Sequence, residues 1–368
     1  MRILVDARVG WGSGIGRYIE NVVPRVARAR ADDAFVVQTP PEYAAQARTL
    51  FDGVANIAVR TVDVASFSLR EQVAMNRLAD GFDLTWFTNY WVPLAFRGRF
   101  MATVHDLLHL DPDLFPASVV KRRLSRLTFA KIARSAAAVS FGSRFSQREF
   151  ERRFGVPDHA AVHYYGIDHA DWRLFDPDAP PPKAKRLLAV GASKAHKNFE
   201  LLLEAWRRAD VPDGWTLSVI SPDQRLRSSI DLAEASRGAA RTDVRSGLTN
   251  ADLHALYAET AIMLTPSLYE GFGLPFMEAM QAGALCISST AQSMVEIGEG
   301  AYAWYVNGAD LEGWVRAIEA GCRFFDTGEI DFAPLQRRNM QLASRFTWDR
   351  VVDRTCALLA EALDGCAD

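Results

Sequence analysis

The chain has 368 residues, of which 49% are hydrophobic and 24% are charged. This length is about twice that of a usual single domain, and the apolar fraction supplies a sizeable core, so the composition favours two folded domains and excludes disorder and fibrous repeats. No apolar run approaches the roughly 20 residues that cross a bilayer, and Asp6 follows Met1 too soon for a signal peptide, so a cytoplasmic protein is expected.

Charge is distributed unevenly along the chain. The net charge is −3, from 42 Lys and Arg against 45 Asp and Glu. Residues 1–175 hold 23 basic and 18 acidic side chains, a balance of +5, which leaves 19 against 27, or −8, for the remainder. The first half is therefore the better partner for an anionic molecule. Cys286, Cys322, Cys356 and Cys366 include no C-x-x-C pair, which argues against a zinc knuckle or a disulfide framework.

In the first half, short β-branched or aromatic runs alternate with amphipathic helical stretches. This pattern is typical of a parallel sheet covered by helices. The expected strands are Arg2–Ala7, Ala34–Pro40, Asn56–Val62, Asp83–Thr88, Phe100–His105, Ala136–Gly142 and Ala161–Tyr165.

A glycine-rich turn, G-S-G-I-G-R-Y from Gly12, follows the first expected strand and leads into an expected helix at Tyr18–Arg28. Such a turn exposes backbone N–H groups to an anion, with the helix dipole behind them. A dinucleotide fingerprint would need glycine in place of Arg17 and an acid after the second strand, where residues 38–40 are Gln-Thr-Pro. The NAD interpretation therefore fails, and a merely tight turn is the alternative.

Two histidines four residues apart, His105 and His109, follow the fifth expected strand. The segment that contains them begins at the end of a strand rather than on a helix, and no cysteine is nearby, so no metal site is expected. His105 is placed to contact a substrate, with a structural histidine as the alternative. The D-x-D runs Asp111–Asp113 and Asp176–Asp178 each contain a proline, which favours turns over metal chelation.

A basic segment at residues 118–153 holds ten Lys and Arg against two acids. Its densest part, Lys121–Arg134, combines basic and apolar residues on one expected helix. Such a helix can lie on an anionic membrane surface or meet a lipid-diphosphate acceptor, and a solvated basic face is the alternative. Nucleic acid is not an expected partner, because the net charge is negative and no recognition module is present.

A proline-rich polar stretch at residues 176–185 predicts a linker between a first domain, 1–175, and a second, 186–345. A last helix within 346–368 could cross back to the first domain. Ligand sites lie beyond the carboxyl ends of parallel strands, so the chemistry is expected in a cleft between the domains. The strands expected in the second domain are Arg186–Gly191, Trp215–Ile220, Asp243–Ser246, Ala261–Pro266, Ala284–Ser288 and Tyr302–Val306.

Two loops of the second domain carry the sharpest signals. After its first strand, G-A-S-K-A-H-K-N-F leads into a helix with Asn198 as the expected cap, and Lys197 with the helix amides suits a diphosphate. After another buried strand, Glu270 lies in a glycine loop and Glu278 two turns down the next helix. These two carboxylates can accept hydrogen bonds from vicinal hydroxyls, while Gly273 lets backbone N–H groups approach the same ligand.

This constellation resembles the retaining glycosyltransferases of family 4, whose GT-B fold has two Rossmann-like, doubly wound α/β domains facing a central cleft. The E-x7-E pattern is specific when it sits in S-x-x-E-G-F-G-L-P-x-x-E-A-M, as it does at residues 267–280. Supporting matches are Gly14-Ile15-Gly16-Arg17-Tyr18, Val104-His105-Asp106, Val139-Ser140 with Ser143, Tyr165-Gly166-Ile167-Asp168, Val190-Gly191 with Lys197-Asn198, and Glu296.

The resemblance implies roles for the second-domain residues. Glu278 is implied to bind the ribose hydroxyls of a donor nucleotide, Lys197 its diphosphate, and Glu270 the hydroxyls of the donor sugar. The backbone beside the sugar and phosphate is that of Phe272, Gly273 and Leu274. Many relatives have an Arg that shares the diphosphate, but this chain has Ala192 there, so Ser193, Lys194 or His196 is an auxiliary candidate.

In the first domain, the resemblance implies that His105 contacts the transferred sugar near its anomeric centre and that Gly14 and Gly16 border the donor phosphate and the acceptor. It further implies retention of configuration by front-face transfer, in which the departing phosphate takes the acceptor's proton. Fixed donors then neutralise the leaving group, so neither a metal nor a cofactor is expected.

The G-I-G-R-Y and K-N loops resemble those of mannosyl- and rhamnosyltransferases of bacterial surface polysaccharide and O-antigen assembly. GDP-mannose is the first expected donor, and a dTDP- or UDP-sugar is the alternative. The expected acceptor is a lipid-linked saccharide or growing glycan, reached on the inner face of the cytoplasmic membrane through Lys121–Arg134. Nucleotide-sugar epimerisation or hydrolysis, or a non-catalytic scaffold, remain alternatives on the same fold.

Overall fold

The computed structural model describes residues 1–168, 174–191, 194–221, 242–301, 303–328 and 331–364. The chain divides into two compact units, here called the first unit (Met1–Gly166 with Thr347–Asp368) and the second unit (Ile167–Phe346). The expected boundary lies at residue 175, whereas the second unit begins at Ile167, whose amide donates to the Phe346 carbonyl at 3.0 Å.

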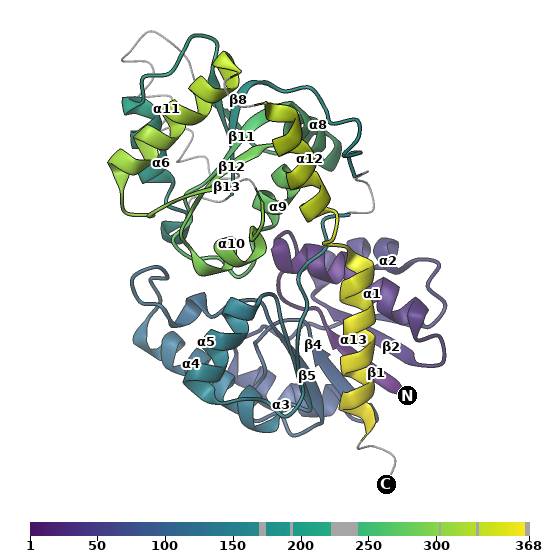
Figure 1. The fold of residues 1–368 in the computed structure, drawn as a ribbon. Helices are drawn as coiled ribbons and strands as arrows, with labels where there is room; N and C mark the ends of the chain where they lie inside the picture. The colour runs from purple at the N-terminus through teal and green to yellow at the C-terminus, as the bar shows by residue number, and fades with distance from the viewer. Residues whose placement is uncertain (169–173, 192–193, 222–241, 302, 329–330, 365–368) are drawn as a thin grey trace. The chain divides into compact units, whose positions relative to one another are not determined.

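The first unit is built on a seven-stranded parallel sheet, in the order β3-β2-β1-β4-β5-β6-β7 (Figure 1). All seven expected strands form, because their apolar residues are buried on a sheet that helices cover. The strands are β1 (Arg2–Asp6), β2 (Ala34–Thr39), β3 (Ile57–Thr61), β4 (Leu84–Phe87), β5 (Phe100–Val104), β6 (Ala138–Phe141) and β7 (Ala160–Val162).

The helices of the first unit include one that begins earlier than expected. Helix α1 starts at Gly14 rather than Tyr18, because the Ser13 hydroxyl caps it by accepting from the Ile15 amide at 3.2 Å. The helices of this unit are α1 (Gly14–Ala29), α2 (Ala44–Phe51), α3 (Leu69–Leu78), α4 (Val119–Ser135), α5 (Arg144–Phe154) and α13 (Trp348–Leu363), with short 3-10 turns η1 (Pro41–Tyr43) and η2 (Leu108–Leu110).

Helix α13 belongs to the first unit although it ends the chain, and it lies beside α1 (Figure 1). The Tyr165 ring stacks on Trp348 with ring centroids 6.1 Å apart. A Cβ on Gly166 would lie 2.2 Å from the Trp348 backbone nitrogen, so this close approach requires glycine. Arg354 adds a hydrogen bond to the Val162 carbonyl at 2.7 Å.

The second unit has a six-stranded parallel sheet, in the order β10-β9-β8-β11-β12-β13, and all six expected strands form. They are β8 (Ala184–Val190), β9 (Thr216–Ile220), β10 (Thr242–Arg245), β11 (Thr260–Thr265), β12 (Leu285–Ser289) and β13 (Ala303–Val306). The helices are α6 (Phe199–Arg208), α8 (Asn250–Glu259), α9 (Leu274–Gln281), α10 (Gln292–Ile297), α11 (Leu311–Thr327) and α12 (Phe332–Ala343), with the 3-10 turn η3 (Ala195–Lys197).

Each unit has its own apolar core. In the first unit, a cluster that includes Phe87, Phe129 and Phe141 lies between the sheet and its helices. In the second unit, Trp215 and Trp314 are fully buried with the apolar side chains of β8, β9 and β11. Among the described residues, no helix combines the length and the apolar character that a membrane span needs.

Candidate active site

Both sheets reverse their strand order at one point, between β1 and β4 in the first unit and between β8 and β11 in the second. In open parallel sheets such switch points create ligand sites at the carboxyl ends of the strands. The candidate residues follow these strand ends: Gly14 after β1, His105 after β5, Lys197 after β8 and Glu270 after β11. Each unit therefore carries its own group of candidate residues.

His105 is held at both ring nitrogens. Its Nε2 lies 2.8 Å from the Thr88 carbonyl oxygen, and its Nδ1 contacts the Tyr165 hydroxyl. A carbonyl only accepts, so Nε2 carries the proton and Nδ1 accepts from the tyrosine. The imidazole is thus fixed in one tautomer and one orientation.

Burial keeps this histidine neutral. Burial lowers the pKa of His105, and the opposing influence of the Thr88 carbonyl and the Asp106 carboxylate is smaller. Burial also raises the pKa of Tyr165 well above its usual value, with Tyr18 and Asp106 adding to the effect. The first unit therefore presents an uncharged hydrogen-bonding pair beside its switch point.

The two glycines at the start of α1 serve different purposes. Gly14 is exposed, and a Cβ there would meet nothing within 4 Å. A Cβ on Gly16 would lie 3.0 Å from the Gly10 carbonyl oxygen, so a side chain there would crowd the backbone before the helix. Both lie in the first helical turn rather than in a preceding loop. The amides of this turn form the anion-attracting end of a long helix without any acid in its first turn.

The other acid and histidine motifs of the first half form local structure. His109 packs between Phe115 and Tyr90, with ring centroids 4.2 and 5.2 Å away, and does not join His105. Asp111 accepts the Asp113 amide at 2.9 Å, so this D-x-D run is the expected turn. No cluster of metal-ligating side chains occurs among the residues that the structure describes.

The second unit brings Lys197 and Glu270 together. The Lys197 ammonium lies 2.5 Å from Oε1 of Glu270, and the Ser267 hydroxyl donates to the same oxygen at 2.7 Å. The side chains of Lys197 and Glu270 are 20% and 12% exposed, so the pair is shielded but reachable by a ligand. The Ser293 hydroxyl donates to the Glu270 backbone carbonyl at 2.6 Å and fixes the loop.

This pair is charged. Burial alone would raise the pKa of Glu270, but the Lys197 ammonium, the Ser267 hydroxyl and the neighbouring His196 together lower it. The lysine has three N–H donors and gives one of them to Glu270. The remaining donors can bind an anion while the carboxylate holds the ammonium in place.

Glu278 lies on α9 and is 5% exposed. Its Oε2 accepts from the Tyr257 hydroxyl at 2.8 Å, which orients the carboxylate. At the start of α9, Gly273 has φ +104°, and a Cβ there would lie 2.5 Å from the Met294 sulfur. Glycine is therefore required at the turn that joins the Glu270 loop to α9. Phe272 is buried beside it, and Leu274 is the first residue of the helix.

The loop after β8 contains the candidates for a second cation beside the diphosphate. Ala192 and Ser193 lie outside the described residues. Lys194 is exposed, whereas His196 is 7% exposed and therefore buried. Lys194 is thus the auxiliary cation that a ligand can reach directly.

The expectation that Asn198 caps α6 is wrong. Asn198 occupies the position but has left-handed backbone, φ +54°, and makes no capping hydrogen bond. Its amide donates instead to the carbonyls of Gly308 and Pro266, at 2.7 and 3.3 Å. Asparagine tolerates this conformation better than most residues, so the position fixes the loop behind Lys197.

Two family models match consecutive parts of the chain. Residues 12–171 match Glycosyltransferase Family 4, and residues 184–322 match Glycosyl transferases group 1. The chain therefore combines a Glycosyltransferase Family 4 domain with a Glycosyl transferases group 1 domain. Its fold is GT-B, since the Anabaena HepE structure with UDP-glucose aligns with a TM-score of 0.72 over 98% of this chain and 99% of that one, at 18% identity. Sucrose-phosphate synthase of Thermosynechococcus elongatus aligns at 0.74 over 99% and 100%, at 16% identity.

Several curated relatives of this glycosyltransferase are mannosyltransferases. GDP-mannose:cellobiosyl-diphosphopolyprenol alpha-mannosyltransferase of Komagataeibacter xylinus is 31% identical over 49% of this chain and 46% of its own length. MMP alpha-(1->4)-mannosyltransferase of Mycolicibacterium hassiacum is 24% identical over 72% and 65%. O-antigen chain mannosyltransferase B of Escherichia coli is 26% identical over 57% and 57%. The matches span less than two thirds of each relative.

Some partners in the glycosyltransferase were not identified from sequence. Tyr165 and Ser267 lie inside the quoted motifs but received no role, and the Thr88 carbonyl, Tyr257 and Ser293 were not singled out. Ser267 precedes Glu270 by three residues, a spacing that could have indicated the contact. No local signal marks Tyr257, which reaches Glu278 from another helix.

Proposed function

We propose that this enzyme transfers a mannosyl residue from GDP-mannose, with retention of configuration, to a lipid-linked or growing surface glycan. The observation that carries the proposal is the shielded Lys197–Glu270 pair, because a fixed ammonium held by a carboxylate suits a nucleotide diphosphate joined to a sugar. The names of the relatives from Komagataeibacter xylinus and Escherichia coli support the sugar, and the former supports GDP-mannose as donor.

In this proposal the second unit binds the donor. Lys197 holds the diphosphate, Lys194 adds a second cation, and the carboxylate of Glu278 accepts hydrogen bonds from ribose hydroxyls. Glu270 accepts from hydroxyls of the mannosyl group, beside the backbone of Phe272, Gly273 and Leu274. A carboxylate has about four lone-pair sites, so Glu278 can accept several hydrogen bonds at once, the one from the Tyr257 hydroxyl among them.

The reaction breaks the bond between the anomeric carbon and the diphosphate oxygen and forms one between that carbon and the oxygen of the acceptor hydroxyl. The cost of separating these charges falls when preorganised donors stabilise the leaving group, and Lys197 with helix-terminal amides supplies such donors without a metal. The leaving phosphate takes the proton of the acceptor hydroxyl on the same face. The neutral His105 ring, fixed by Thr88 and Tyr165, contacts the transferred sugar without adding a positive charge beside a cationic transition state.

The donor class is tested by thermal unfolding of the protein with GDP, UDP, dTDP and ADP, each with and without magnesium. Specific binding stabilises by RT ln(1+[L]/Kd), so GDP is expected to raise the Tm more than the other nucleotides, and magnesium is expected to add nothing. A larger shift with UDP or dTDP would replace the proposed donor, and no shift with any nucleotide would oppose the donor site.

The reaction itself is tested with GDP-mannose and a polyprenyl-diphosphate disaccharide. The expected product carries an α-linked mannose, read from the anomeric proton signal. Free mannose or an epimer formed without acceptor would indicate a hydrolase or an epimerase instead. A β-linked product would exclude retention. Donor binding without turnover would favour a scaffold.

A further inference from the structure

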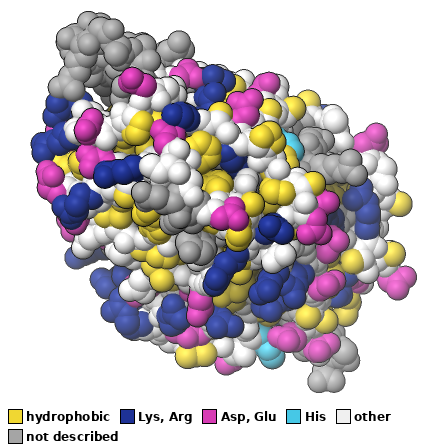
Figure 2. Space-filling view, turned by 45° about the horizontal axis from the view of Figure 1, so that its top comes forward, with side chains coloured by type: hydrophobic (Ala, Val, Ile, Leu, Met, Phe, Trp, Pro, Cys, Tyr) yellow, Lys and Arg dark blue, Asp and Glu magenta, His cyan; other side chains and the backbone are white. Residues whose placement is uncertain are grey.

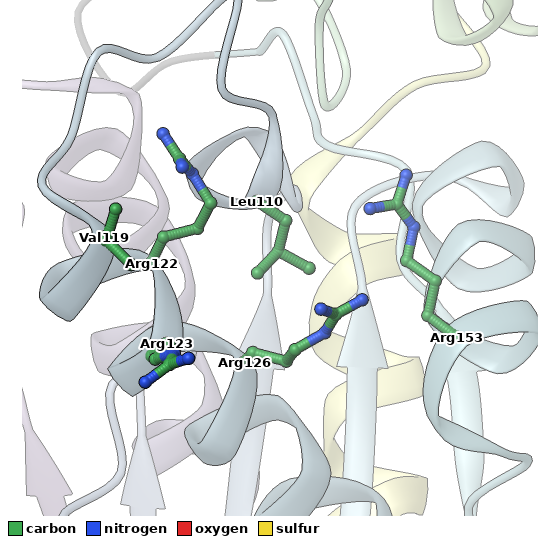
Figure 3. Close-up of a pocket in the computed structure, with 6 residues that line it drawn as sticks. All are labelled: Leu110, Val119, Arg122, Arg123, Arg126 and Arg153. Atoms are coloured by element: carbon green, nitrogen blue, oxygen red, sulfur yellow. The ribbon is translucent and has the colours of Figure 1, made fainter.

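A pocket in the first unit has no place in the donor site. It has a volume of about 230 Å³, many times the roughly 30 Å³ of one water molecule, so it has room for a multi-atom group. Four of its six lining side chains are arginines (Figure 3). Leu110 and Val119 form its apolar part, and the arginines are Arg122, Arg123 and Arg126 of α4 and Arg153 of α5.

The arginines of this pocket, here called the arginine pocket, are poorly neutralised. Within the described part of the chain, the side chains of Arg123 and Arg126 make no hydrogen bond or ion pair. Arg122 donates only to the Ala117 carbonyl, and its Nε is buried without a partner in the same described residues. Arg153 pairs with Glu149, which it shares with Arg152. The pocket therefore holds several positive charges that lack a counterion.

The arrangement suits phosphate groups. Figure 3 shows Leu110 between Arg122 and Arg126, with Arg153 extending from the neighbouring helix. Guanidinium forks bind phosphate oxygens in pairs and keep their charge at any pH the protein meets. Several guanidinium groups around one cavity exceed the need of a single neutral sugar and match the two linked groups of a diphosphate.

The arginine pocket continues into exposed apolar surface. Val119 and Val120 at the start of α4 are 64% and 76% exposed. The Lys121 ammonium lies 5.7 Å from the centre of the Phe67 ring, so the start of α3, where Leu69 is 91% exposed, adjoins the start of α4. Exposed apolar side chains beside a cationic pocket mark a ligand with a charged head and an apolar tail.

The rest of the basic segment does not form one continuous charged face. Lys131 turns inward, since its ammonium donates to the Phe96 carbonyl at 2.7 Å. On the face drawn in Figure 2, basic, acidic and hydrophobic side chains are interspersed. A flat bilayer surface would call for charges spread over one face, whereas four of these basic residues line one cavity.

We infer that the arginine pocket binds the diphosphate of an isoprenoid-diphosphate-linked acceptor, with the first isoprene units on Val119, Val120 and the apolar side chains near α3. The inference rests on the proposed function, because the bound molecule is an acceptor only if the enzyme transfers a sugar to it. It adds the class of the acceptor, the site and the residues that bind it.

The test measures binding of farnesyl diphosphate to the full-length protein by calorimetry. Arg123→Gln combined with Arg126→Gln removes two exposed charges without emptying the core and is expected to weaken binding roughly tenfold or more. Arg123→Lys with Arg126→Lys keeps the charge but loses the fork, so its affinity is expected to fall between the two. Arg152→Gln, on α5 beside Arg153 but outside the pocket, is the matched control and is expected to bind like the unmodified protein.

Three further probes separate the sources of the signal. Inorganic pyrophosphate is expected to bind more weakly than farnesyl diphosphate but with the same dependence on Arg123 and Arg126, and farnesol is expected to show no such dependence. Vesicles of phosphatidylcholine with phosphatidylglycerol are expected to bind both proteins alike. Equal farnesyl diphosphate affinity in the glutamine variant overturns the inference, as does a loss confined to vesicle binding.

Failure of the pocket and failure of the proposed function are distinguishable. If the unmodified protein transfers no mannose but binds farnesyl diphosphate through the arginines, the proposed function fails and the pocket stands. If mannose is transferred to the lipid acceptor with an unchanged acceptor KM in the glutamine variant, the pocket fails and the proposed function stands.

Discussion

The candidate residues of the first unit are neutral, whereas those of the second unit include a charged carboxylate. In the first unit, burial lowers the pKa of His105 and raises that of Tyr165, so both stay neutral. In the second unit, the Lys197 ammonium overcomes burial and lowers the pKa of Glu270, so this carboxylate stays charged. Similar degrees of burial therefore give opposite charge states.

The difference comes from the partners and fits two chemical tasks. A carbonyl and a hydroxyl satisfy an imidazole without stabilising a charge on it, whereas an ammonium 2.5 Å from a carboxylate stabilises both charges. A neutral hydrogen-bonding group can contact a sugar that becomes positive during transfer. A fixed cation can neutralise a leaving diphosphate. Exchanging or removing these partners should therefore separate sugar transfer from donor binding.

The largest effect is expected from Lys197→Ala. It removes the donor to the leaving group and leaves Glu270 buried without its cation, so kcat/KM with GDP-mannose is expected to fall by about 10²–10³-fold. Steady-state kinetics measure the change. Lys185→Ala, which removes an exposed lysine at the start of β8, is the matched control and should keep full activity. A kcat/KM within twofold of the unmodified enzyme, about 0.4 kcal/mol, would remove Lys197 from the chemistry.

A smaller loss is expected from His105→Ala. The variant loses the neutral ring that contacts the transferred sugar, and kcat is expected to fall by about 10²-fold while the KM for GDP-mannose changes little. Tyr165→Phe removes only the hydroxyl that holds Nδ1, so it should lower kcat less and shift the acid limb of the pH–rate profile. An unchanged pH profile in Tyr165→Phe would contradict the proposed positioning of the imidazole.

Much of the fold could be predicted because each strand carries its own signal. Runs such as β5 and β11 are mostly apolar and buried at every position, and the residues after them fall at the carboxyl edge of the sheet. His105 and Glu270 could therefore be placed from sequence. The loop motif around Glu270 adds the glycine turn that leads into α9.

Long-range contacts carry no such local signal. The periodicity of α13 indicates an apolar face but not which surface covers it, and the Trp348–Tyr165 stacking decides that question. The contact between Tyr257 and Glu278 joins two helices in the same way. At Asn198, residue type alone favoured a cap, but two carbonyls from other loops compete for its amide and determine its conformation.

Glu278→Ala is expected to act on binding rather than on turnover. It removes the carboxylate proposed for the ribose hydroxyls, so the Kd for GDP should rise roughly tenfold while kcat at saturating donor changes less. Glu270→Ala should show the reverse pattern, with a lower kcat and a smaller change in Kd. Tyr257→Phe controls for loss of the buried contact, since it keeps the carboxylate. Unchanged GDP affinity in Glu278→Ala would exclude the ribose assignment.

The smallest expected effect concerns a second neutral histidine of the first unit. His163 is 1% exposed, its Nδ1 lies 3.2 Å from the Thr355 hydroxyl on α13, and no partner for Nε2 occurs among the described residues. Burial, with a contribution from Arg354, lowers the pKa of His163 to about 3. Below its ordinary value of about 6.5 the unfolded chain binds a proton that the folded chain does not, so stability falls as the pH drops from about 6.5 toward about 3.

His163→Gln keeps a hydrogen-bonding group for Thr355 but does not titrate. The variant is expected to be less stable than the unmodified protein at pH 7. This gap in unfolding free energy should narrow by roughly 1.2 kcal/mol near pH 5.5, because only the unmodified protein loses the stability that the neutral His163 contributes. Urea unfolding at both pH values measures the gap. Other groups that titrate in this range contribute equally to the stability of both proteins, so their contributions cancel in the difference. A difference in stability that stays constant would mean that His163 takes up its proton in the folded state. Burial would then not keep the histidine beneath α13 neutral.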